Sequence, residues 1–336
     1  MSHIWEFLRS MTAAVVENVL HVLAYPFVPG ERIYIPYLLT SLAAATGVYV
    51  VSLRRARGSS VGGPGGLLQF LFPRTVWSTR SAWLDVRYFF LHQIVRVFIY
   101  GAFAVAITTW SYQLVAGALG LTNIGPVTPR AASWGVELGY ALLSFALQDL
   151  VGYAIHYGQH RIPILWAFHK VHHSARVMHP LTNYREHPVD NVVYAAGLAA
   201  CSGATMAVVF AMAGYVPRIP TVGGVGIFAA AFNLLGYNLR HSHIWLRWPG
   251  PLVYVFGCPA HHQVHHSYHP SHINKNFAFV FPVWDLIFGT FRVPSTNAEV
   301  RFGLGEHEDD ELTSCLRLYW VPFRDAARTL RGPRRG

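Results

Sequence analysis

Charged side chains are scarce in this sequence of 336 residues, because Asp, Glu, Lys and Arg together make up only 12% of it. An ordinary soluble domain has roughly 25% charged residues, so a soluble globular protein fits poorly. Hydrophobic residues make up 53% of the chain, whereas a disordered chain has low hydrophobicity and high net charge. The scarcity of charge therefore argues against both classes and favours a protein of the membrane.

Cysteine and lysine are also scarce. The three cysteines, Cys201, Cys258 and Cys315, lie far apart without a CxxC spacing, so we expect reduced thiols and no disulfide framework. Only two of the 26 basic residues are lysines, and the formal net charge is +10. Such a surplus suits nucleic acid or anionic lipid. The apolar composition favours lipid, and nucleic acid is not expected as a partner.

The start of the chain lacks the pattern of a signal peptide, which needs a basic segment, an apolar core and a cleavage site of small residues. Apolar residues recur at helical spacing over the first 19 residues instead. This pattern predicts a helix that lies on the membrane or packs against it.

Five windows are long and apolar enough for a transmembrane helix, which needs about 20 residues. They cover approximately 33–53, 94–119, 132–155, 191–215 and 221–240. Cytoplasmic loops of membrane proteins carry the excess of Arg and Lys. If the tract at 54–57 is cytoplasmic, the five spans leave four basic residues outside, which are Arg9, Arg32, Arg130 and Arg218. The sequence therefore predicts a multi-pass cell membrane protein.

Histidine is abundant, since 19 histidines outnumber the 16 aspartates and glutamates. Nine of them fall in three motifs and at the end of the fifth window: His156, His160, His169, His172, His173, His241, His262, His265 and His266. Within each motif, spacings of three and four residues place the rings on one face of a helix. Five spans bring all nine to the cytoplasmic side.

So many imidazoles in one place need a metal, because buried rings would otherwise be left unpaired or, if protonated, would repel one another. One four-coordinate zinc uses three or four ligands, so nine candidates point to two metals. Residue type alone does not name the metal, since imidazole suits iron, copper, nickel and zinc. A zinc-dependent hydrolase is a weaker alternative, because HYGQH lacks the glutamate of HExxH.

This pattern resembles the fatty acid hydroxylase and sterol desaturase superfamily of integral-membrane di-iron oxygenases. The similar text runs from Asp149 to Phe291 and ends in WDLIFGT at 284–290. The resemblance implies two irons held by the nine histidines. It adds His187 as a further ligand or a partner of one, and Asn238 as a residue that holds a metal-bound water. Asp149 lies two helical turns before His156, so it is expected to hydrogen-bond a ligand's second ring nitrogen.

Three departures from the family are Tyr157, where Arg is usual, Asn276-Phe277-Ala278 in place of NYG, and extra histidines around the motifs. These extra histidines, His179, His243, His261, His269 and His272, are expected to lie on the surface or beside the ligands rather than to bind the metals directly. No catalytic residue beyond the metal ligands is predicted. Trp284 and Asp285 are expected to lock a loop over the site.

The expected fold class is all-α: an integral-membrane helical bundle of about five spans with a cytoplasmic, histidine-rich di-metal cap. Residues 1–130 are expected to form an N-terminal membrane-anchoring region with an interfacial helix, two spans and a cytoplasmic loop. Residues 131–295 would form a catalytic domain of the fatty acid hydroxylase type, and 296–336 a cytoplasmic amphipathic tail.

The resemblance implies an oxygenase that uses O2 and two external electrons to hydroxylate an unactivated C–H bond of a lipid taken from the bilayer, such as a fatty acyl chain or sterol. A desaturase with the same site and an ether-lipid (alkylglycerol-type) monooxygenase are alternatives. A membrane metal-binding or transport protein is a third, although transporters place ionisable residues along a path inside the spans. The sequence has no dinucleotide, iron–sulfur or haem motif, so a separate electron donor is expected, a ferredoxin, cytochrome or reductase.

Overall fold

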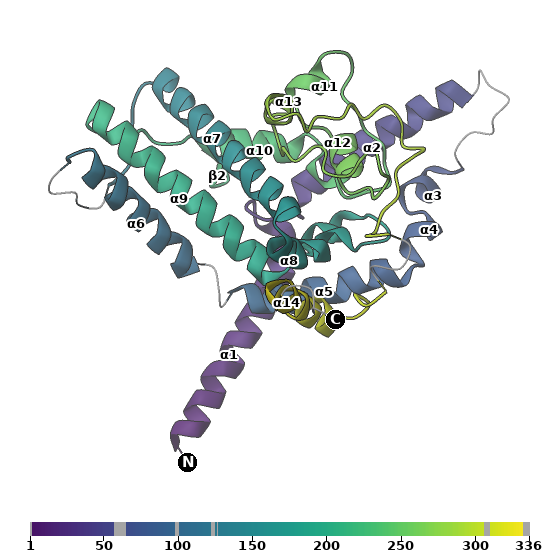
Figure 1. Cartoon of the computed structure of the whole chain (residues 1–336), viewed down its shortest axis with the longest axis horizontal. Helices are drawn as coiled ribbons and strands as arrows, with labels where there is room; N and C mark the ends of the chain where they lie inside the picture. Colours follow the sequence, from purple (N-terminus) through teal and green to yellow (C-terminus); the bar gives the residue numbers. More distant parts are fainter. Residues whose placement is uncertain are drawn as a thin grey trace.

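The computed structural model of the chain is mostly helical, as the sequence predicted (Figure 1). It describes residues 2–56, 65–97, 101–121, 125, 127–305 and 310–331. The α-helices are α1 (Ser2–Ala24), α2 (Ile35–Ala56), α3 (Leu67–Leu71), α4 (Arg74–Trp77), α5 (Arg80–Val97), α6 (Gly101–Ala118), α7 (Trp134–Arg161), α8 (Pro163–His173), α9 (Pro188–Ala213), α10 (Ile227–Leu234), α11 (Leu252–Val255), α12 (Pro259–His265), α13 (Val283–Ile287) and α14 (Cys315–Arg331). Shorter 3₁₀ turns are η1 (Tyr25–Phe27), η2 (Pro180–Tyr184) and η3 (Tyr237–Leu239), and a hairpin joins β1 (Thr221–Val222) to β2 (Val225–Gly226).

Among the described residues, three helices are long and apolar enough to cross a membrane: α2, α7 and α9. They overlap three of the predicted windows, those at 33–53, 132–155 and 191–215. The window at 94–119 falls on the end of α5 and on α6, and residues 98–100 between these helices lie outside the described residues. The number of helices that cross the bilayer stays a prediction.

The window at 221–240 is not a spanning helix, and this prediction is wrong. It begins with the β1–β2 hairpin, whose turn is made by Gly223 and Gly224, both at positive φ. The helix that follows, α10, has 8 residues, or about 12 Å, and Gly236 stops it at a φ of +84°. Glycine tolerates this left-handed backbone without steric cost, so the segment is apolar but too broken to span.

Helices α6, α7 and α9 pack side by side and lead from the centre of the molecule to its upper left edge (Figure 1). The closest approach is at Gly203 of α9, where a Cβ atom would lie 2.2 Å from the carbonyl oxygen of Thr108 in α6. One turn earlier, the Ser111 hydroxyl of α6 donates to the carbonyl of Ala200 at 2.7 Å. Small residues let these two apolar helices approach at backbone distance.

Helix α2 has a different environment from the one predicted. Arg32, just before α2, was expected across the membrane from the histidines, but its Nη1 donates to the Asn183 carbonyl (2.6 Å) and pairs with Glu186 (2.9 Å), beside them. The middle of α2 packs against Leu239 and Ile244 through Ala45. The prediction that Arg32 and the histidines lie on opposite sides of the membrane is therefore wrong, because a count of charges does not show which loop a helix end contacts.

Helix α14 is amphipathic, as expected for the C-terminal region. Leu318 and Val321 on its inner face pack into a core with Val171 of α8 and Leu84 of α5. Its outer face exposes apolar side chains, Leu316, Trp320 and Leu330, next to several arginines. Contact of this outer face with a membrane surface stays a prediction.

We predict that Gly203→Ala destabilises the protein by about 1–3 kcal/mol, because the new methyl group overpacks the α6–α9 contact. Thermal unfolding of the purified protein in detergent measures this. The matched control is Gly139→Ala in α7, where a Cβ atom meets nothing within 4 Å. Equal melting temperatures for the two variants would contradict the proposed close contact.

Candidate metal centre

The nine predicted ligand histidines lie together in one region, where the end of α7, α8, α12 and the segment after η3 meet. They form two groups in which all candidate ligand atoms lie within 4.8 Å of one another. We call them the first cluster, His156, His160, His169, His173 and His265, and the second cluster, His172, His241, His262 and His266. All are buried except His160, which is half-buried. That they bind metal stays a prediction, but the structure brings together all nine histidines that the sequence selected as ligands.

Each HxxHH motif contributes to both clusters. Helix α8 places His169 and His173, which are four residues apart on one face, in the first cluster and His172 in the second. Helix α12 and its C-cap divide in the same way, with His265 in the first cluster and His262 and His266 in the second. Consecutive helical residues differ in direction by about 100°, so adjacent histidines reach two neighbouring positions. The motif itself therefore favours two metals lying close together.

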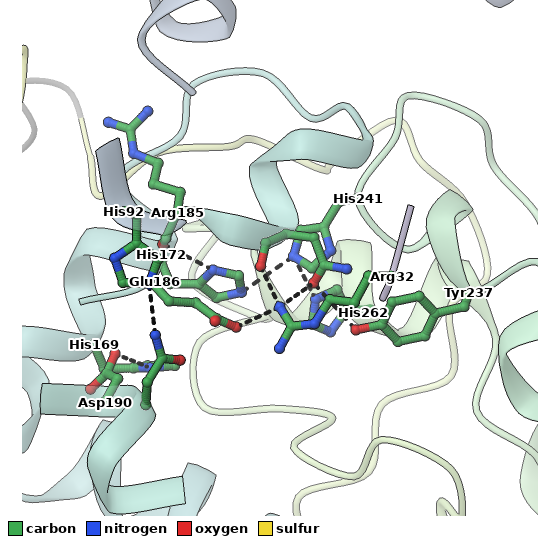
Figure 2. Close-up of polar contacts among 12 residues, drawn as sticks. Arg32, His92, His169, His172, Arg185, Glu186, Asp190, Tyr237, His241 and His262 are labelled. Atoms are coloured by element: carbon green, nitrogen blue, oxygen red, sulfur yellow. Dashed lines mark hydrogen bonds and ion pairs between the residues drawn. The ribbon is translucent and has the colours of Figure 1, made fainter. Parts of the chain in front are cut away.

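Ring nitrogens face one another at short distances within the clusters. In the second cluster, His241 Nε2 lies 3.2 Å from His172 Nε2 and 3.0 Å from His262 Nε2 (Figure 2). In the first cluster, the Nε2 atoms of His160 and His173 are 3.1 Å apart. Two ligands bound to one ion at about 2.1 Å are separated by roughly 3.0–3.4 Å. One proton can join only one pair of nitrogens, so converging nitrogens fit a shared cation better.

The second ring nitrogen of five cluster histidines is hydrogen-bonded to the protein. Three of these bonds use backbone carbonyls: His156 Nδ1 to Phe277 (2.9 Å), His265 Nδ1 to Lys275 (2.9 Å) and His172 Nδ1 to Arg185 (3.3 Å). An N–H that donates outward fixes the tautomer and leaves the Nε2 lone pair for a metal. The Nε2 atoms of His169 and His265 are buried and have no hydrogen-bond partner among the described residues. The donor set and these free nitrogens fit metal ions.

Burial keeps the rings neutral. It lowers the pKa of His172 to about 4 and the pKa of His265 to about 3, because an imidazolium is poorly solvated in the interior. Only an unprotonated nitrogen can bind a metal. These two rings are therefore ready to act as ligands at neutral pH.

The carboxylate that contacts a cluster histidine is Asp190, which the sequence analysis missed. Its Oδ2 accepts from His169 Nδ1 at 3.2 Å (Figure 2). Its Oδ1 accepts from the Gln159 amide at 3.1 Å. A carboxylate behind a histidine ligand orients the ring and raises its basicity. The signal was present in the HPVD element, where Asp190 follows the helix N-cap by three residues.

Asp149 does not hydrogen-bond a cluster histidine, so its predicted role is wrong. Its two oxygens accept from the backbone N–H groups of Val280 (3.0 Å) and Phe281 (2.9 Å) and from the indole of Trp284 (3.0 Å). The helical spacing gave the correct face of α7, but a different segment covers that face. Asp149 therefore anchors the loop that crosses the site.

Asp285 completes the anchoring of this loop. Its oxygens accept from the backbone N–H groups of Phe277 (2.8 Å) and Ala278 (3.0 Å). This fixes Phe277, whose carbonyl accepts from His156. The role agrees with the structural function expected for WDLIFGT.

His187 and Asn238 lie outside the clusters. His187 caps α9, with Nδ1 accepting from Val189 N (3.1 Å) and Nε2 donating to the Tyr319 carbonyl (3.1 Å), so no ring nitrogen is left for a metal. The predicted ligand role of His187 is therefore wrong. Asn238 donates through Nδ2 to the Arg32 carbonyl at 2.9 Å, and its Oδ1 is buried without a hydrogen-bond partner among the described residues. That Asn238 holds a metal-bound water stays a prediction.

His262 differs from the other histidines, because its Nδ1 contacts a guanidinium. Arg240 Nη2 lies 3.0 Å from this nitrogen, and a guanidinium always donates. The imidazole therefore accepts at Nδ1. If Nε2 binds a metal as well, the ring carries negative charge, which the buried Arg240 would offset.

An apolar cavity of about 390 Å³ is lined in part by residues close in sequence to His241 of the second cluster. Its walls include Leu38 and Leu42 of α2, Trp77, and Leu239. Residues on either side of His241 in the sequence, Asn238 and Ser242, also line it. The cavity has the apolar lining and few polar groups typical of a small-molecule site.

Part of the chain is similar to one protein family and to several characterised proteins. A family model described as "Fatty acid hydroxylase" matches residues 141–290. Alkylglycerol monooxygenase of Danio rerio is 32% identical over 162 residues, which are 48% of this chain and 32% of that protein. A very-long-chain aldehyde decarbonylase of Oryza sativa is 31% identical over 201 residues, 54% of this chain and 29% of the relative. An ornithine lipid hydroxylase of Rhizobium tropici is 26% identical over 175 residues, 50% of this chain and 45% of the relative.

The chain thus spans less than half of the length of each of these relatives. No solved structure matches it. The matched region contains all nine histidines of the two clusters.

We predict that Asp190→Asn weakens metal binding about 10–100-fold, because His169 loses its carboxylate partner. Metal titration of the purified protein, read by elemental analysis after dialysis, measures this. The control is Asp310→Asn, since Asp310 lies on the surface and pairs with Arg176. Unchanged metal affinity in the Asp190 variant would rule out the assigned role.

Proposed function

Because residues 141–290 belong to the fatty acid hydroxylase family, we propose that this chain is a membrane-bound di-iron oxygenase that hydroxylates an unactivated C–H bond of a lipid. One observation carries the proposal: two adjacent, buried histidine clusters that share the same two HxxHH motifs. Buried imidazoles at such short separations have no simpler explanation than two bound metals. The names of the relatives, a monooxygenase, a decarbonylase and a hydroxylase, support an oxidoreductase.

In this proposal the first cluster holds one iron and the second cluster holds the other. The five imidazoles of the first cluster exceed the four ligands of an ordinary structural zinc site, which favours a metal of higher coordination number. Bound iron would supply the one-electron and O2 chemistry that no side chain provides. The protein keeps the rings neutral, fixes their tautomers through backbone carbonyls and shields them from water.

The substrate is proposed to enter the apolar cavity lined in part by residues close in sequence to His241. Its volume of about 390 Å³ suits part of a lipid chain rather than a whole lipid. Leu38 and Leu42 would contact the chain from the α2 side, and Asn238 and Ser242 lie next to His241. The protein would thus position an apolar chain near the second metal, which is the main contribution of an enzyme to such a reaction.

The electron donor is proposed to be a separate ferredoxin, cytochrome or reductase. We propose that the site faces the cytoplasm, although the count of basic residues that suggested this orientation placed Arg32 on the opposite side of the membrane from the histidines. An acidic carrier would be attracted by the net positive charge of the chain, +10, through long-range electrostatics.

Ether-lipid monooxygenation is the second candidate. It is favoured by the alkylglycerol monooxygenases among the relatives, at 31% identity for the human protein and 32% for the zebrafish protein. Desaturation would use the same site and differs only in the fate of the substrate after hydrogen abstraction. A metal transporter is disfavoured, because the clusters lie at the ends of helices and not along a path through them.

We expect about two iron ions per chain in the purified protein, since two clusters are present. His172→Ala and His265→Ala should each lower oxygen-dependent turnover at least about a hundredfold, because each removes a ligand from a different cluster. Lipid mass spectrometry that compares a deletion strain with its parent strain identifies the reaction. Gain of one oxygen atom indicates hydroxylation, and loss of two hydrogen atoms indicates desaturation.

The control for these variants is His21→Ala, which changes an exposed histidine of α1. One tightly held zinc with turnover independent of O2 would refute the proposed function. Full activity in either cluster variant would refute the site.

Leu42→Trp should raise the KM for the lipid roughly tenfold with unchanged iron content, because it reduces the space available to the chain. Leu39→Trp is the matched control, since Leu39 is 58% exposed and does not line the cavity. Steady-state kinetics with both variants tests the assignment. Equal KM values would place the substrate elsewhere.

A further inference from the structure

We propose that His269, His272 and Glu299 form a separate site for one zinc ion, which joins the loop after α12 to the segment before α14. The candidate ligand atoms of these three side chains all lie within 4.8 Å of one another. The two rings contact each other, with centroids 5.0 Å apart, and no ring contact joins them to the nine cluster histidines. The site is therefore distinct from the two clusters.

Backbone hydrogen bonds bring the two segments together. The N–H of Tyr268 donates to the carbonyl of Arg301 at 2.9 Å, and the Ser267 hydroxyl accepts from the N–H of Arg301 at 3.0 Å. Ser267 also forms an isolated antiparallel bridge with Phe302. Glu299 lies two residues before Arg301, so these bonds bring its carboxylate near the loop. The ligand set is thus fixed by the fold rather than by chance surface contact.

A turn places the two histidines on the same side. The N–H of His272 donates to the carbonyl of His269 at 2.8 Å. His269 Nδ1 is 2.9 Å from the Ser271 hydroxyl. When Nδ1 carries the proton and donates to this hydroxyl, Nε2 is left to bind a metal. The Ser271 N–H lies 3.4 Å from the same Nδ1 atom.

The buried His272 ring faces Glu299 through Nε2, which is its candidate zinc ligand. It is 3% exposed, and its Nδ1 is buried without a hydrogen-bond partner among the described residues. Its Nε2 lies 3.9 Å from Glu299 Oε2, which is too far for a hydrogen bond. Two ligands of a tetrahedral zinc ion are separated by about 3.4 Å. Glu299 is on the surface and needs to move by only about half an ångström to reach that separation.

The donor set indicates zinc. Two imidazoles and one carboxylate, with a fourth position open to water, form a three-ligand set found in zinc proteins. Arg292 lies near His272 and opposes a bound cation, whereas the Glu299 carboxylate favours one. This balance predicts moderate rather than very tight affinity.

The site would stabilise the loop that supports the first cluster. Three residues after His272, the carbonyl of Lys275 accepts from His265 Nδ1 at 2.9 Å. Asn276, next in sequence, has a φ of +57°, a conformation that asparagine tolerates better than most residues. A zinc ion at His272 would restrain this loop from its N-terminal side. The inference does not depend on the reaction proposed above.

The test is a zinc titration of the full-length protein in detergent with its iron sites loaded. Equilibrium dialysis followed by elemental analysis measures zinc and iron per chain. We expect one zinc per chain beyond the iron, with affinity at least tenfold weaker in both His272→Asn and Glu299→Gln. The iron content should be unchanged in both variants.

The matched controls are His21→Asn and Glu17→Gln, which change exposed residues of α1 and should bind zinc as the unchanged protein does. If His272→Asn fails to fold, Glu299→Gln decides, because that side chain is about half exposed. Equal zinc binding in Glu299→Gln and the unchanged protein would overturn the proposal. So would zinc uptake matched by release of iron, since this would place the zinc in the histidine clusters.

Discussion

Two buried carboxylates hold the loop on which the first histidine cluster depends. Asp149 and Asp285 accept five hydrogen bonds from residues 277–284 and so fix the backbone from Phe277 to Phe281. The carbonyl of Phe277 is therefore held in place, and its hydrogen bond with His156 Nδ1 orients the His156 ring. Neither carboxylate is placed to bind a metal. They act indirectly. By fixing the backbone, they hold the Phe277 carbonyl oxygen in the position where it accepts a hydrogen bond from His156.

The division of each HxxHH motif between the clusters has a similar logic. A single short helix, α8 or α12, supplies ligand candidates to both positions. The distance between the two positions is then set by helical geometry, which is stiff, and not by the packing of separate domains. The long apolar helices α7 and α9 are needed to hold α8 and the Asp190 carboxylate against them.

The nine histidines could be selected from the sequence, because spacings of three and four residues place the rings of each motif on one face of a helix, and the family resemblance implies that the motifs meet. Contacts between residues far apart in the sequence could not be predicted in this way. Helical spacing gave the face of α7 on which Asp149 lies but not the loop that covers that face. Asp190 was overlooked although it lies three residues after His187, which the sequence analysis selected. The errors at Arg32 and at 221–240 have the same origin. Charge counts and apolarity describe a segment's preference for an environment, whereas the contacts of α2 with Leu239 and the glycine-rich hairpin depend on tertiary structure.

The packing of α14 on α8 has a consequence for how the protein is made. Leu318 fills a core with Val171, and the carbonyl of Tyr319 holds the His187 ring that caps α9. Residues 315–331 leave the ribosome more than a hundred residues after α8 and α9, and segments synthesised first generally fold first. The part of the chain that carries the histidine clusters therefore keeps one apolar face uncovered until α14 has been synthesised. Metal insertion is expected to follow translation of α14 rather than accompany that of the histidine motifs.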